Sequence, residues 1–488
     1  MREATYEGDY EAIAELEQFH YASEKEVVAL WVCTQCQKTI PANAKPLCDC
    51  GGEARLKEIR GSTPASRFLV LELAERLPFE PRILGYLRLD PPIPRMHRRT
   101  PEGVERDIRE RIFPRDWFHP TYEGGADWQK ALDRVNTAAA RIARVVVHPD
   151  YRSEGFGALL VRVALEWAKE RGAPEARREK HLVYTIAQMA RYHPFFEKVG
   201  FRYLFDTASG RPVLFYPLTE EAEAHLERFL REDPYAKAHG GRLYKPRFGR
   251  VPGLPGPIRL AGVHKAYRSH LDLEGLSREV QEALLAFGVK ARVVERAVLR
   301  GASLEIPPGS LVVLAGASGA GKTTLLRLLL GEAPDAGEVA VPPGRRVAYI
   351  PGEREVDLGE APILEAVYRR LKDVGAAIEV LNRVGLSDAV LYRARPHELS
   401  TGQRERFRLA LLLAERPDLL LIDEFAAHLD VPTARRVALG LGKLCREAGV
   451  TLVAATHRPE VVAALDPDLL VYVGYGGLTT VPRRGPRT

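Results

Sequence analysis

The sequence predicts an α/β protein made of two modules, and three observations support this prediction. An apolar strand, a glycine-containing loop and a helix follow one another twice, at about residues 142–171 and 311–330. The stretch from Pro234 to Pro257 contains no acidic residue and is rich in Pro, Gly and basic residues, which is typical of a linker between domains. Four of the five cysteines fall within 18 residues, which predicts a small metal-binding insert.

Length and composition agree with a globular protein of more than one domain. The chain has 488 residues, more than one ordinary core accommodates. Hydrophobic residues make up 45% and charged residues 28%, which argues against extensive disorder. A net charge of +6 is compatible with a nucleic-acid partner but does not require one. Because no run of 18 apolar residues and no signal peptide is visible, we expect a cytoplasmic protein without a membrane span.

We place the domain boundaries from these composition changes. The first module covers residues 1–218, the cysteine insert 26–60, a helix followed by the basic linker 219–257, and the second module 258–488. In the first module the expected elements are a helix at Asp9–His20, strands at Phe68–Leu73, Ile83–Leu89 and Ile142–Val147, and a helix at 156–171. Between the first two strands of the second module lies an insert with helical spacing at Leu276, Val280, Leu284 and Leu285.

The second module contains a phosphate-binding loop. Residues 316–324 fit the pattern G-x-x-x-x-G-K-[ST] and lie between an apolar strand and a helical run, the context that this motif requires. Its glycines let backbone N–H groups surround the phosphates of ATP. Lys322 would neutralise the β- and γ-phosphates, and the Thr323 hydroxyl would bind Mg²⁺. The residues predicted to contact the nucleotide here are Gly316, Ser318, Gly319, Gly321, Lys322, Thr323 and Thr324.

Further motifs of this module occur in a fixed order. The segment Leu399-Ser-Thr-Gly-Gln403 is followed by the apolar strand Leu419–Ile422, which ends in Asp423 and Glu424. Asp430 and His457 come next, and an aromatic residue, Tyr267, follows the first strand. Over residues 258–475 this order resembles the ABC-type ATPases. The resemblance implies that Ser400, Gly402, Gln403 and Asp430 contact nucleotide, that Asp423 binds Mg²⁺, that Glu424 is the catalytic base, that His457 is the switch histidine and that Tyr267 stacks on adenine.

The module departs from the ABC pattern in four respects. The usual Q-loop glutamine is absent, because the chain continues as Gly352-Glu353; Glu353 is a candidate substitute. Thr401 occupies a position that usually holds Gly, and only 76 residues separate Lys322 from Leu399. In this family the signature of one module closes over the ATP of another, whereas this chain has a single module. The resemblance therefore implies a homodimer formed through the ATPase modules.

The glycine-containing loop of the first module has a different character. The segment from Val145 to Gly157, with Val147, Arg152, Gly155, Phe156 and Gly157 as its defining residues, resembles the acyl-CoA-binding segment of GNAT acyltransferases. The resemblance implies a GNAT-like mixed sheet, a pyrophosphate held by backbone N–H groups near residues 153–158, and acyl-CoA, most simply acetyl-CoA, as cofactor. The chain is thus identified as a fusion of a GNAT-like domain and an ABC-type ATPase domain.

The GNAT-like module departs from the family pattern at the residue that usually serves as the catalytic acid. The segment Phe195–Phe201 matches the family's closing segment, but Phe196 stands where a tyrosine usually protonates the leaving thiolate. Tyr192, His193 and Tyr184 are candidates for that role. Glu154 and His181 are candidates for the general base.

The clustered cysteines suit zinc. Cys33, Cys36, Cys48 and Cys50 form two close pairs across an expected hairpin, giving four thiolates and hence a structural site of zinc-ribbon type. An iron–sulfur cluster and unligated core cysteines are the alternatives. Cys445 is expected to be a core thiol.

Basic residues suggest a nucleic-acid partner, with a solvated basic surface as the alternative. The candidate residues are Arg95, Arg98, Arg99, Arg177, Arg178, Lys180, the aromatic-interleaved stretch Arg242–Arg250, and Arg483, Arg484 and Arg487. We therefore expect an ATPase and acyltransferase that modifies or remodels nucleic acid. The alternatives are the ATP-binding subunit of a membrane transporter and an ATP-regulated acetyltransferase of proteins or small molecules.

Overall fold

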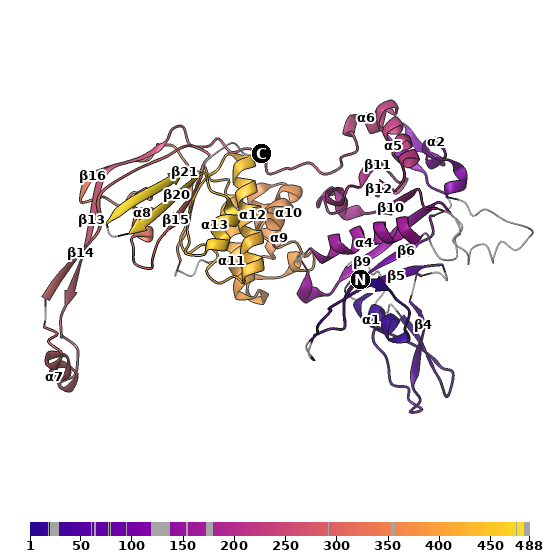
Figure 1. Cartoon of the computed structure of the whole chain (residues 1–488), viewed down its shortest axis with the longest axis horizontal. Helices are drawn as coiled ribbons and strands as arrows, with labels where there is room; N and C mark the ends of the chain where they lie inside the picture. Colours follow the sequence, from indigo (N-terminus) through magenta and orange to yellow (C-terminus); the bar gives the residue numbers. More distant parts are fainter. Residues whose placement is uncertain are drawn as a thin grey trace, which may run out of the picture. The chain divides into compact units, whose positions relative to one another are not determined.

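The computed structural model consists of two compact units, Met1–Lys245 and Pro246–Thr488 (Figure 1). It describes residues 1–17, 19, 29–59, 61–62, 65–76, 78, 80–93, 95–118, 137–152, 155–171, 179–290, 292–352, 357–474 and 476–482. The predicted stretch 219–257 is divided between the two units. Its helical part packs with the first unit, and its residues from 246 onward pack with the second.

The first unit is built on a seven-stranded mixed sheet of order β1-β5-β6-β9-β10-β12-β11. Its strands are β1 (Arg2–Glu3), β5 (Arg67–Glu72), β6 (Ile83–Asp90), β9 (Ala139–Val147), β10 (Leu182–Ile186), β11 (Arg202–Asp206) and β12 (Pro212–Pro217). Strands β9 and β10 run parallel, but they pair only from Ala139 to Ile142 on β9. From Ala143 onward β9 therefore has no β10 partner, so one edge of this strand is left open.

Helices cover both faces of that sheet. Helix α4 (Phe156–Arg171) packs its apolar stripe on the face formed by alternate residues such as Leu87 and Val183. Helix α1 (Glu7–Glu17) covers β5 and β6 on the opposite face, where Ile13 contacts the core around Tyr86. Toward β10 and β12 this opposite face is covered by α2 (Arg109–Ile112), α5 (Glu220–Glu232) and the adjoining α6 (Pro234–His239). A small hairpin of β7 (Arg98–Thr100) and β8 (Gly103–Glu105) completes the unit.

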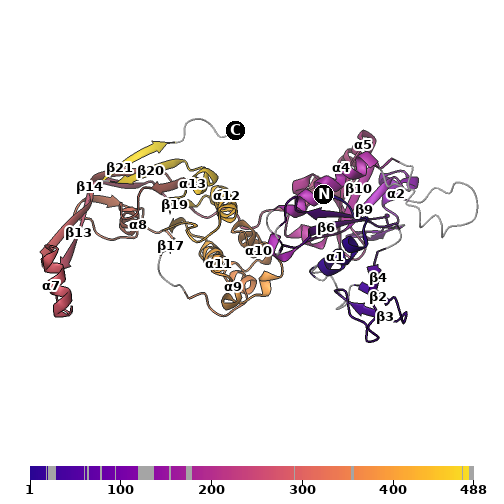
Figure 2. The ribbon, with the colours of Figure 1, turned by 60° about the horizontal axis from the view of Figure 1, so that its bottom comes forward.

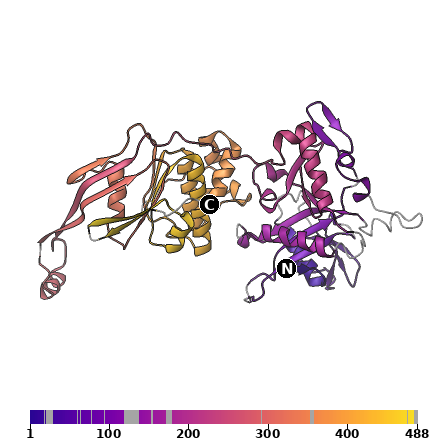
Figure 3. The same cartoon turned by 45° about the horizontal axis from the view of Figure 1, so that its top comes forward.

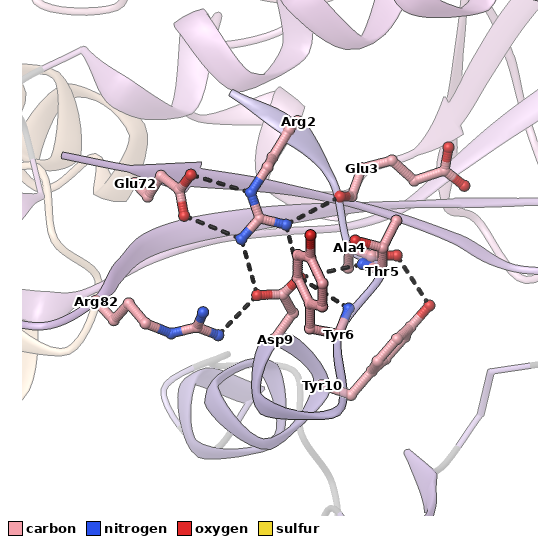
Figure 4. A network of polar contacts seen from close by, with 9 residues as sticks. All are labelled: Arg2, Glu3, Ala4, Thr5, Tyr6, Asp9, Tyr10, Glu72 and Arg82. Carbon is pink, nitrogen blue, oxygen red and sulfur yellow. Dashed lines mark hydrogen bonds and ion pairs between the residues drawn. The ribbon is translucent and has the colours of Figure 1, made fainter. Parts of the chain in front are cut away.

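A buried polar network fixes the start of α1 to the sheet edge (Figure 4). The Arg2 guanidinium donates to both carboxylate oxygens of Asp9, at 2.6 and 2.9 Å, and to both of Glu72, at 3.0 Å each. Arg82 donates to Asp9 as well, at 2.7 Å. Hydrogen bonds from Arg2 hold the pKa of Asp9 far below its ordinary value, against the opposing effect of burial. The network thus joins β1, α1 and β5 through a fully buried carboxylate.

The cysteine insert is a three-stranded antiparallel sheet of order β3-β2-β4, seen below α1 in Figure 2. Its strands are β2 (Ala29–Cys33), β3 (Thr39–Ala42) and β4 (Ala54–Ile59). The insert contributes Trp31, which is fully buried, to the same apolar cluster as α1. It is therefore packed against the first unit and does not stand apart from it.

The second unit contains a six-stranded sheet of order β17-β18-β19-β15-β20-β21 and a three-stranded antiparallel sheet of order β14-β13-β16. The strands are β13 (Ile258–Leu271), β14 (Arg292–Ile306), β15 (Leu311–Ala315), β16 (Ala336–Ala340), β17 (Val347–Ile350), β18 (Leu419–Ile422), β19 (Thr451–Ala455), β20 (Leu469–Gly474) and β21 (Gly477–Pro482). The helices are α7 (Arg278–Ala286), α8 (Lys322–Leu329), α9 (Ile363–Leu371), α10 (Val374–Arg383), α11 (Thr401–Ala414), α12 (Val431–Ala448) and α13 (Pro459–Leu465).

Two cores sandwich the six-stranded sheet. Helix α8 and the antiparallel sheet cover one face, where Val312 and Leu325 belong to the same cluster. Helices α9 to α12 cover the other, where Val313 and Phe407 meet. Cys445 is fully buried in this second cluster, as expected for a core thiol. The central parallel strands are buried on both faces, which explains their unbroken apolar runs.

The insert between the first two strands of this unit forms an arm. Strands β13 and β14 pair along their whole length, and the predicted helix is α7 at the tip of that hairpin (Figure 3). No residue of α7 is buried. The helical spacing predicted this helix correctly. Within the described part of the chain, the apolar side of the helix is not covered.

The beginning of the second unit corrects one functional expectation. Phe248, which we expected to be available for stacking on a base, is 1% exposed and belongs to the ATPase core. Glu379 accepts hydrogen bonds from the backbone N–H groups of Arg247 and Phe248, at 2.6 and 3.0 Å. Arg416 lies over the Phe248 ring, 5.0 Å from its centroid. The aromatic residue anchors the chain to the unit because burying its ring is more favourable than exposing it.

Candidate functional site

The phosphate-binding loop joins β15 to α8 in the centre of the six-stranded sheet. Three of its glycines, Gly316, Gly319 and Gly321, have φ values of 146°, 72° and 111°, which side-chain-bearing residues rarely adopt. A Cβ atom at Gly316 would lie 2.2 Å from the Val473 carbonyl oxygen on β20. Glycine is therefore required both by the backbone conformation and by the close approach of the neighbouring strand.

The two residues expected to neutralise phosphate and to hold Mg²⁺ lie at the start of α8. Lys322 Nζ donates to the Gly316 and Ala317 carbonyl oxygens, at 2.8 Å each, so it curls over the loop. Burial lowers the pKa of Lys322 from its ordinary value, while the nearby carboxylates of Asp423 and Glu424 oppose that shift. Thr323 Oγ1 donates to Asp423 Oδ2 at 2.7 Å. Two oxygens of the type Mg²⁺ prefers are thus already adjacent, which fits the predicted metal.

Glu424 follows Asp423 at the end of β18. It adopts a left-handed backbone conformation, with φ of 49°, a strained state that is often retained at functional sites. Its side chain is exposed and lies against Gly352, because a Cβ placed on Gly352 would be 3.0 Å from Glu424 Oε2. The carboxylate therefore adjoins the start of the altered Q-loop. The proposed substitute, Glu353, lies outside the described residues.

The signature segment, residues 399–403, caps a helix next to residues 428–430, where the ABC resemblance places the D-loop. Ser400 is the N-cap of α11, and its hydroxyl accepts from the Gln403 backbone N–H while Gln403 Oε1 accepts from that of Ser400. A Cβ on Gly402 would lie 3.1 Å from a methyl group of Leu429. Asp430 caps α12 by accepting from the Thr433 N–H at 2.9 Å. Signature and D-loop are thus held together, and both capping geometries follow from residue types that favour helix N-termini.

The predicted adenine platform lies on the antiparallel sheet. Tyr267 on β13 is half-buried, its hydroxyl donates to Glu332 at 3.2 Å, and Lys265 lies 5.7 Å from the ring centroid. Its cross-strand partner is Arg296 on β14, which donates to the Gly319 carbonyl at 2.7 Å. The sequence analysis did not identify Arg296. Pairing of the two strands in register was the only signal that could have connected it with the phosphate-binding loop.

His457 is placed at the end of β19, as the order of motifs predicted, and is exposed. The neighbouring Arg458 was not identified from sequence. It donates to the Ala426 and Leu429 carbonyl oxygens, at 2.7 and 2.5 Å, and so ties the histidine-bearing turn to the D-loop. Within one chain the structure brings together the phosphate-binding loop, Asp423 and Glu424.

The acyl-CoA-type loop joins β9 to α4 in the first unit. Gly155 has φ of 88° and α4 begins at Phe156, so the free N–H groups of the helix start lie at this loop. A Cβ on Gly157 would lie 3.1 Å from the Phe195 ring, so glycine permits this close packing. Arg152 donates to the Val147 and Phe19 carbonyl oxygens, at 3.1 and 2.6 Å. The loop, α1's end and the last residue of β9 are therefore connected. Residues 153 and 154, including the candidate base Glu154, lie outside the described part.

The candidate acids of this unit differ in accessibility. Phe196 is 5% exposed and packs between Phe195 and Phe201. Tyr192 is half-buried at the turn before it. The adjacent His193 has an Nδ1 atom with no partner among the described residues, and burial lowers its pKa to about 4, so it is neutral at pH 7.

Two other candidates are structural. Tyr184 is fully buried, its hydroxyl accepts from the Ile93 N–H at 2.8 Å and its ring stacks on Phe215. His181 stacks on Trp117, with ring centroids 4.4 Å apart, and contacts the Thr219 hydroxyl at 3.0 Å. Both therefore serve the core beside α5, and neither lies on the open edge of β9.

The four predicted zinc ligands converge in the insert. The sulfur atoms of Cys33, Cys36, Cys48 and Cys50 all lie within 4.8 Å of one another. Three of the pairs are 3.4 to 3.5 Å apart. Tetrahedral zinc with bonds of about 2.3 Å places its sulfurs about 3.8 Å apart, so this group fits the metal. Backbone N–H groups of Cys36 and Gln35 lower the pKa of Cys33 to about 6, which favours the thiolate.

Some of the basic residues selected from sequence are structural. Arg98 is 3% exposed and pairs with Glu105 and Asp233, at 2.6 and 2.9 Å. Lys180 is 3% exposed and donates to the Thr137 carbonyl. Arg95, Arg99, Arg242, Lys245, Arg247 and Arg250 are exposed. Arg177, Arg178, Arg483, Arg484 and Arg487 lie outside the described residues. No helix of the described part is long and apolar enough to cross a membrane.

Comparison with known families finds two domains. Residues 299–427 match the ABC transporter model, and residues 123–203 match the acetyltransferase (GNAT) domain model. The zinc import ATP-binding protein of Ruegeria pomeroyi is 34% identical over 198 residues, covering 39% of this chain and 75% of that protein. The lipoprotein-releasing system ATP-binding protein of Rhodospirillum rubrum is 35% identical over 193 residues, covering 35% and 84%.

One further relative is matched over less of its length. The methionine import ATP-binding protein of Mesorhizobium japonicum is 34% identical, and the chain spans 56% of it. The dimeric structure of a bacterial ABC transporter cassette shares 22% identity, with 47% of this chain and all of that chain covered and a TM-score of 0.35. The expected fusion is confirmed: the chain belongs to the ABC ATP-binding family through its second unit and carries a GNAT acetyltransferase domain in its first.

Proposed function

We propose that the second unit binds and hydrolyses ATP with Mg²⁺. The single observation that carries this proposal is the 2.7 Å contact between Thr323 Oγ1 and Asp423 Oδ2 at the phosphate-binding loop. Bound Mg²⁺ supplies charge stabilisation for the phosphates. By the ABC resemblance, Lys322 would neutralise the phosphates and Glu424 would serve as the base for the attacking water.

We propose that two copies of the chain complete each ATP site. Support comes from the order of motifs and from the separation of their roles in the fold. Ser400 caps α11, whose Gly402 lies against Leu429, whereas Lys322 starts α8 on the other side of the sheet. Light scattering of the Glu424→Gln variant with and without ATP tests this. A doubling of mass with ATP is expected, and a monomer under both conditions contradicts the dimer.

We propose that the first unit transfers an acyl group from acyl-CoA to an acceptor amine. The support is the loop of Gly155 and Gly157 at the start of α4 beside the open edge of β9 from Ala143 to Val147. That edge offers backbone groups to the amides of the pantetheine arm. Release of the CoA thiol from acetyl-CoA, measured with and without a panel of amines, tests the proposal. Tyr192 is the proposed acid, and His193 is a proposed polar positioning group. Tyr192→Phe is the variant that tests the acid.

We propose that the cysteine insert holds one structural zinc ion. Its four thiolates leave no open position for substrate, and the insert packs Trp31 into the core beside α1. Elemental analysis of the purified chain is expected to give one zinc per chain, lost in Cys36→Ser and retained in Cys445→Ser. Iron with a visible absorption band would instead indicate a cluster.

We propose nucleic acid as the partner of the ATPase activity. The exposed basic residues Arg242, Lys245, Arg247 and Arg250 and the net charge of +6 support this, although Phe248 is buried. ATP turnover is expected to rise with DNA or RNA, to lose that rise steeply with salt and to vanish in Glu424→Gln. The names of the relatives support the alternative of a transporter subunit. Turnover that is indifferent to any polymer would favour that alternative or a regulated small-molecule acetyltransferase.

A further inference from the structure

A cluster of buried charges lies between the end of α1 and the sheet of the first unit. It consists of Glu17, Arg88, Asp90, Arg141 and Arg144, which we call the charged cluster. Asp90 accepts from Ser66 at 2.8 Å and from Arg141 at 2.9 Å, and Arg144 donates to Glu17 at 3.1 Å. The side chains of Glu17, Arg88 and Asp90 are 4%, 4% and 2% exposed.

The charges of this cluster do not balance. It holds three guanidinium groups and two carboxylates, and Arg88 lies directly across from Arg144 in the pairing of β6 with β9. Like charges facing each other across two strands destabilise a sheet unless a counter-charge lies between them. Glu17 and Asp90 supply two counter-charges. One positive charge of the cluster is left without an internal partner.

Unpaired atoms identify where the cluster lacks a negative charge. Arg88 Nε lies 3.1 Å from Asp90 Oδ1 without the alignment of a hydrogen bond, and Arg88 Nη1 meets no partner among the described residues. Glu17 Oε2 has no partner among these residues either. Burial raises the pKa of Glu17 and lowers that of Arg88, so burial disfavours both charged forms. Buried polar atoms are seldom left unsatisfied, so these two atoms call for a partner such as a water, an ion or a ligand.

The position of the cluster points to the acceptor rather than to the cofactor. Arg144 lies on the part of β9 that has no β10 partner, where the proposed acyl donor would pair. A β-bulge between Arg88 and Leu89 distorts the pairing at this point, a feature common beside active sites. Arg152 of the acyl-CoA-type loop holds the Phe19 carbonyl, two residues after Glu17. Arg141 and Arg144, at 26% and 30% exposure, form the solvent side of the cluster.

We propose that the charged cluster binds the acyl acceptor, and that this acceptor is a small amine carrying a carboxylate or phosphate group. Arg88 and Arg144 donate to the oxyanion, and the free oxygen of Glu17 accepts from the amine. One molecule thereby supplies an acceptor for the unpaired donor and a donor for the unpaired acceptor. This inference rests on the proposed acyltransferase function of the first unit, and it is independent of the proposed nucleic-acid partner.

Binding measured without acyl-CoA tests the inference separately from catalysis. Titration calorimetry of the full chain uses phosphoethanolamine and glycine as probes, with ethanolamine and glycinamide as counterparts that lack the oxyanion. We expect at least one of the two probes that carry an oxyanion to bind, and its counterpart without the oxyanion to bind about ten- to a hundredfold more weakly. Equal binding of a probe and its counterpart, or no binding of either anionic probe, overturns the proposal. Loss of acyl transfer with binding intact would count against the acyltransferase function alone.

Variants assign the binding to these residues. Arg88→Met and Arg144→Gln should each weaken binding of the probe about ten- to a hundredfold. Because Arg88 is buried, Arg144→Gln serves as the variant least apt to unfold. Its matched control is Arg202→Gln, a 27% exposed arginine of the same unit that pairs with Glu223. Unchanged affinity in Arg144→Gln, or displacement of the bound probe by an oligonucleotide, contradicts a small acceptor at this site.

Discussion

The two strand–loop–helix junctions of this molecule share a local design and differ in their surroundings. In the second unit, β15 lies between β19 and β20, and its loop is met by Asp423 from the end of the next-but-one strand, β18. In the first unit, β9 has an open edge after Ile142, and its loop is tied by Arg152 to the end of α1. Both loops use glycines with positive φ followed by a helix start.

The comparison indicates that the neighbouring strands, and not the glycines of the loop, distinguish the two junctions. A strand that is paired on both sides brings carboxylates from parallel neighbours to one edge, as phosphate transfer with Mg²⁺ requires. A strand whose neighbour diverges leaves backbone groups free for an extended ligand. The loop sequences alone distinguish these cases only through residues outside the glycines. Each of the following changes tests this comparison at a different point.

Removing Glu424, the proposed base of the second unit, is expected to have the largest effect. Glu424→Gln keeps the size of the side chain but removes its proton acceptor, and ATP turnover should fall about 10²- to 10⁴-fold. Turnover is measured by phosphate release at saturating ATP. Glu415→Gln, an exposed partner of Arg370 in the same unit, should remain close to wild type. CoA release by the first unit should be unchanged when ATP is absent. A loss of less than tenfold would place the base elsewhere.

Loosening α1 tests how far the first junction depends on its surroundings. Asp9→Asn removes the charge of a fully buried carboxylate that pairs with Arg2, and we expect the first unit to lose about 3 kcal/mol of stability. All four tryptophans, at positions 31, 117, 128 and 167, belong to this unit, so tryptophan fluorescence during urea unfolding of the full chain reports it alone. Glu7→Gln, an exposed carboxylate 3.9 Å from Arg55, should change stability by less than about 0.5 kcal/mol.

The same carboxylate gives the first unit a defined acid dependence. Hydrogen bonds from Arg2 lower the pKa of Asp9 in the folded state below its ordinary 3.8. Its contribution is therefore complete above about pH 4 and is lost as the pH falls further. Unfolding midpoints measured between pH 3 and 6 should decline more in the wild type than in Asp9→Asn. Parallel curves for the two proteins would show that Asp9 does not carry this dependence.

Adding one methyl group to each loop compares the junctions directly. Gly316→Ala places Cβ 2.2 Å from a backbone oxygen of β20, which cannot move without breaking the sheet, so a loss of about 3 kcal/mol and of nucleotide binding is expected. At Gly155 an added Cβ meets no atom of the described residues within 4 Å. Only the φ of 88° disfavours alanine there, so a loss of about 1 to 2 kcal/mol of stability is expected. Binding of a fluorescent ATP analogue and urea unfolding check both. Equal losses in the two variants would show that pairing on both sides of β15 and the open edge of β9 make no difference to the loops that follow.

Much of the organisation followed from sequence because it rests on local patterns. The motif of Gly316 to Thr324 fixed the place of the phosphate-binding loop, and α4 begins and ends where its periodicity predicted. Spacing also predicted that Cys33, Cys36, Cys48 and Cys50 converge. Residue type alone misjudged Phe248, Arg98 and Lys180: each was assigned to a basic or stacking surface and is buried with a partner. Whether an aromatic or a cation faces water depends on elements distant in sequence.

The sequence alone predicted the positions of both glycine-containing loops and, for the second loop, the lysine and paired carboxylates expected around phosphates. Which charges meet depends on the tertiary structure. Strand register decides that Arg88 lies across from Arg144, that atoms of Glu17 and Arg88 stay unpaired among the described residues, and that Arg296 contacts Gly319. Register is set by the packing of whole faces, because a shift of one residue would turn every side chain to the other side of the sheet. No single motif carries that information.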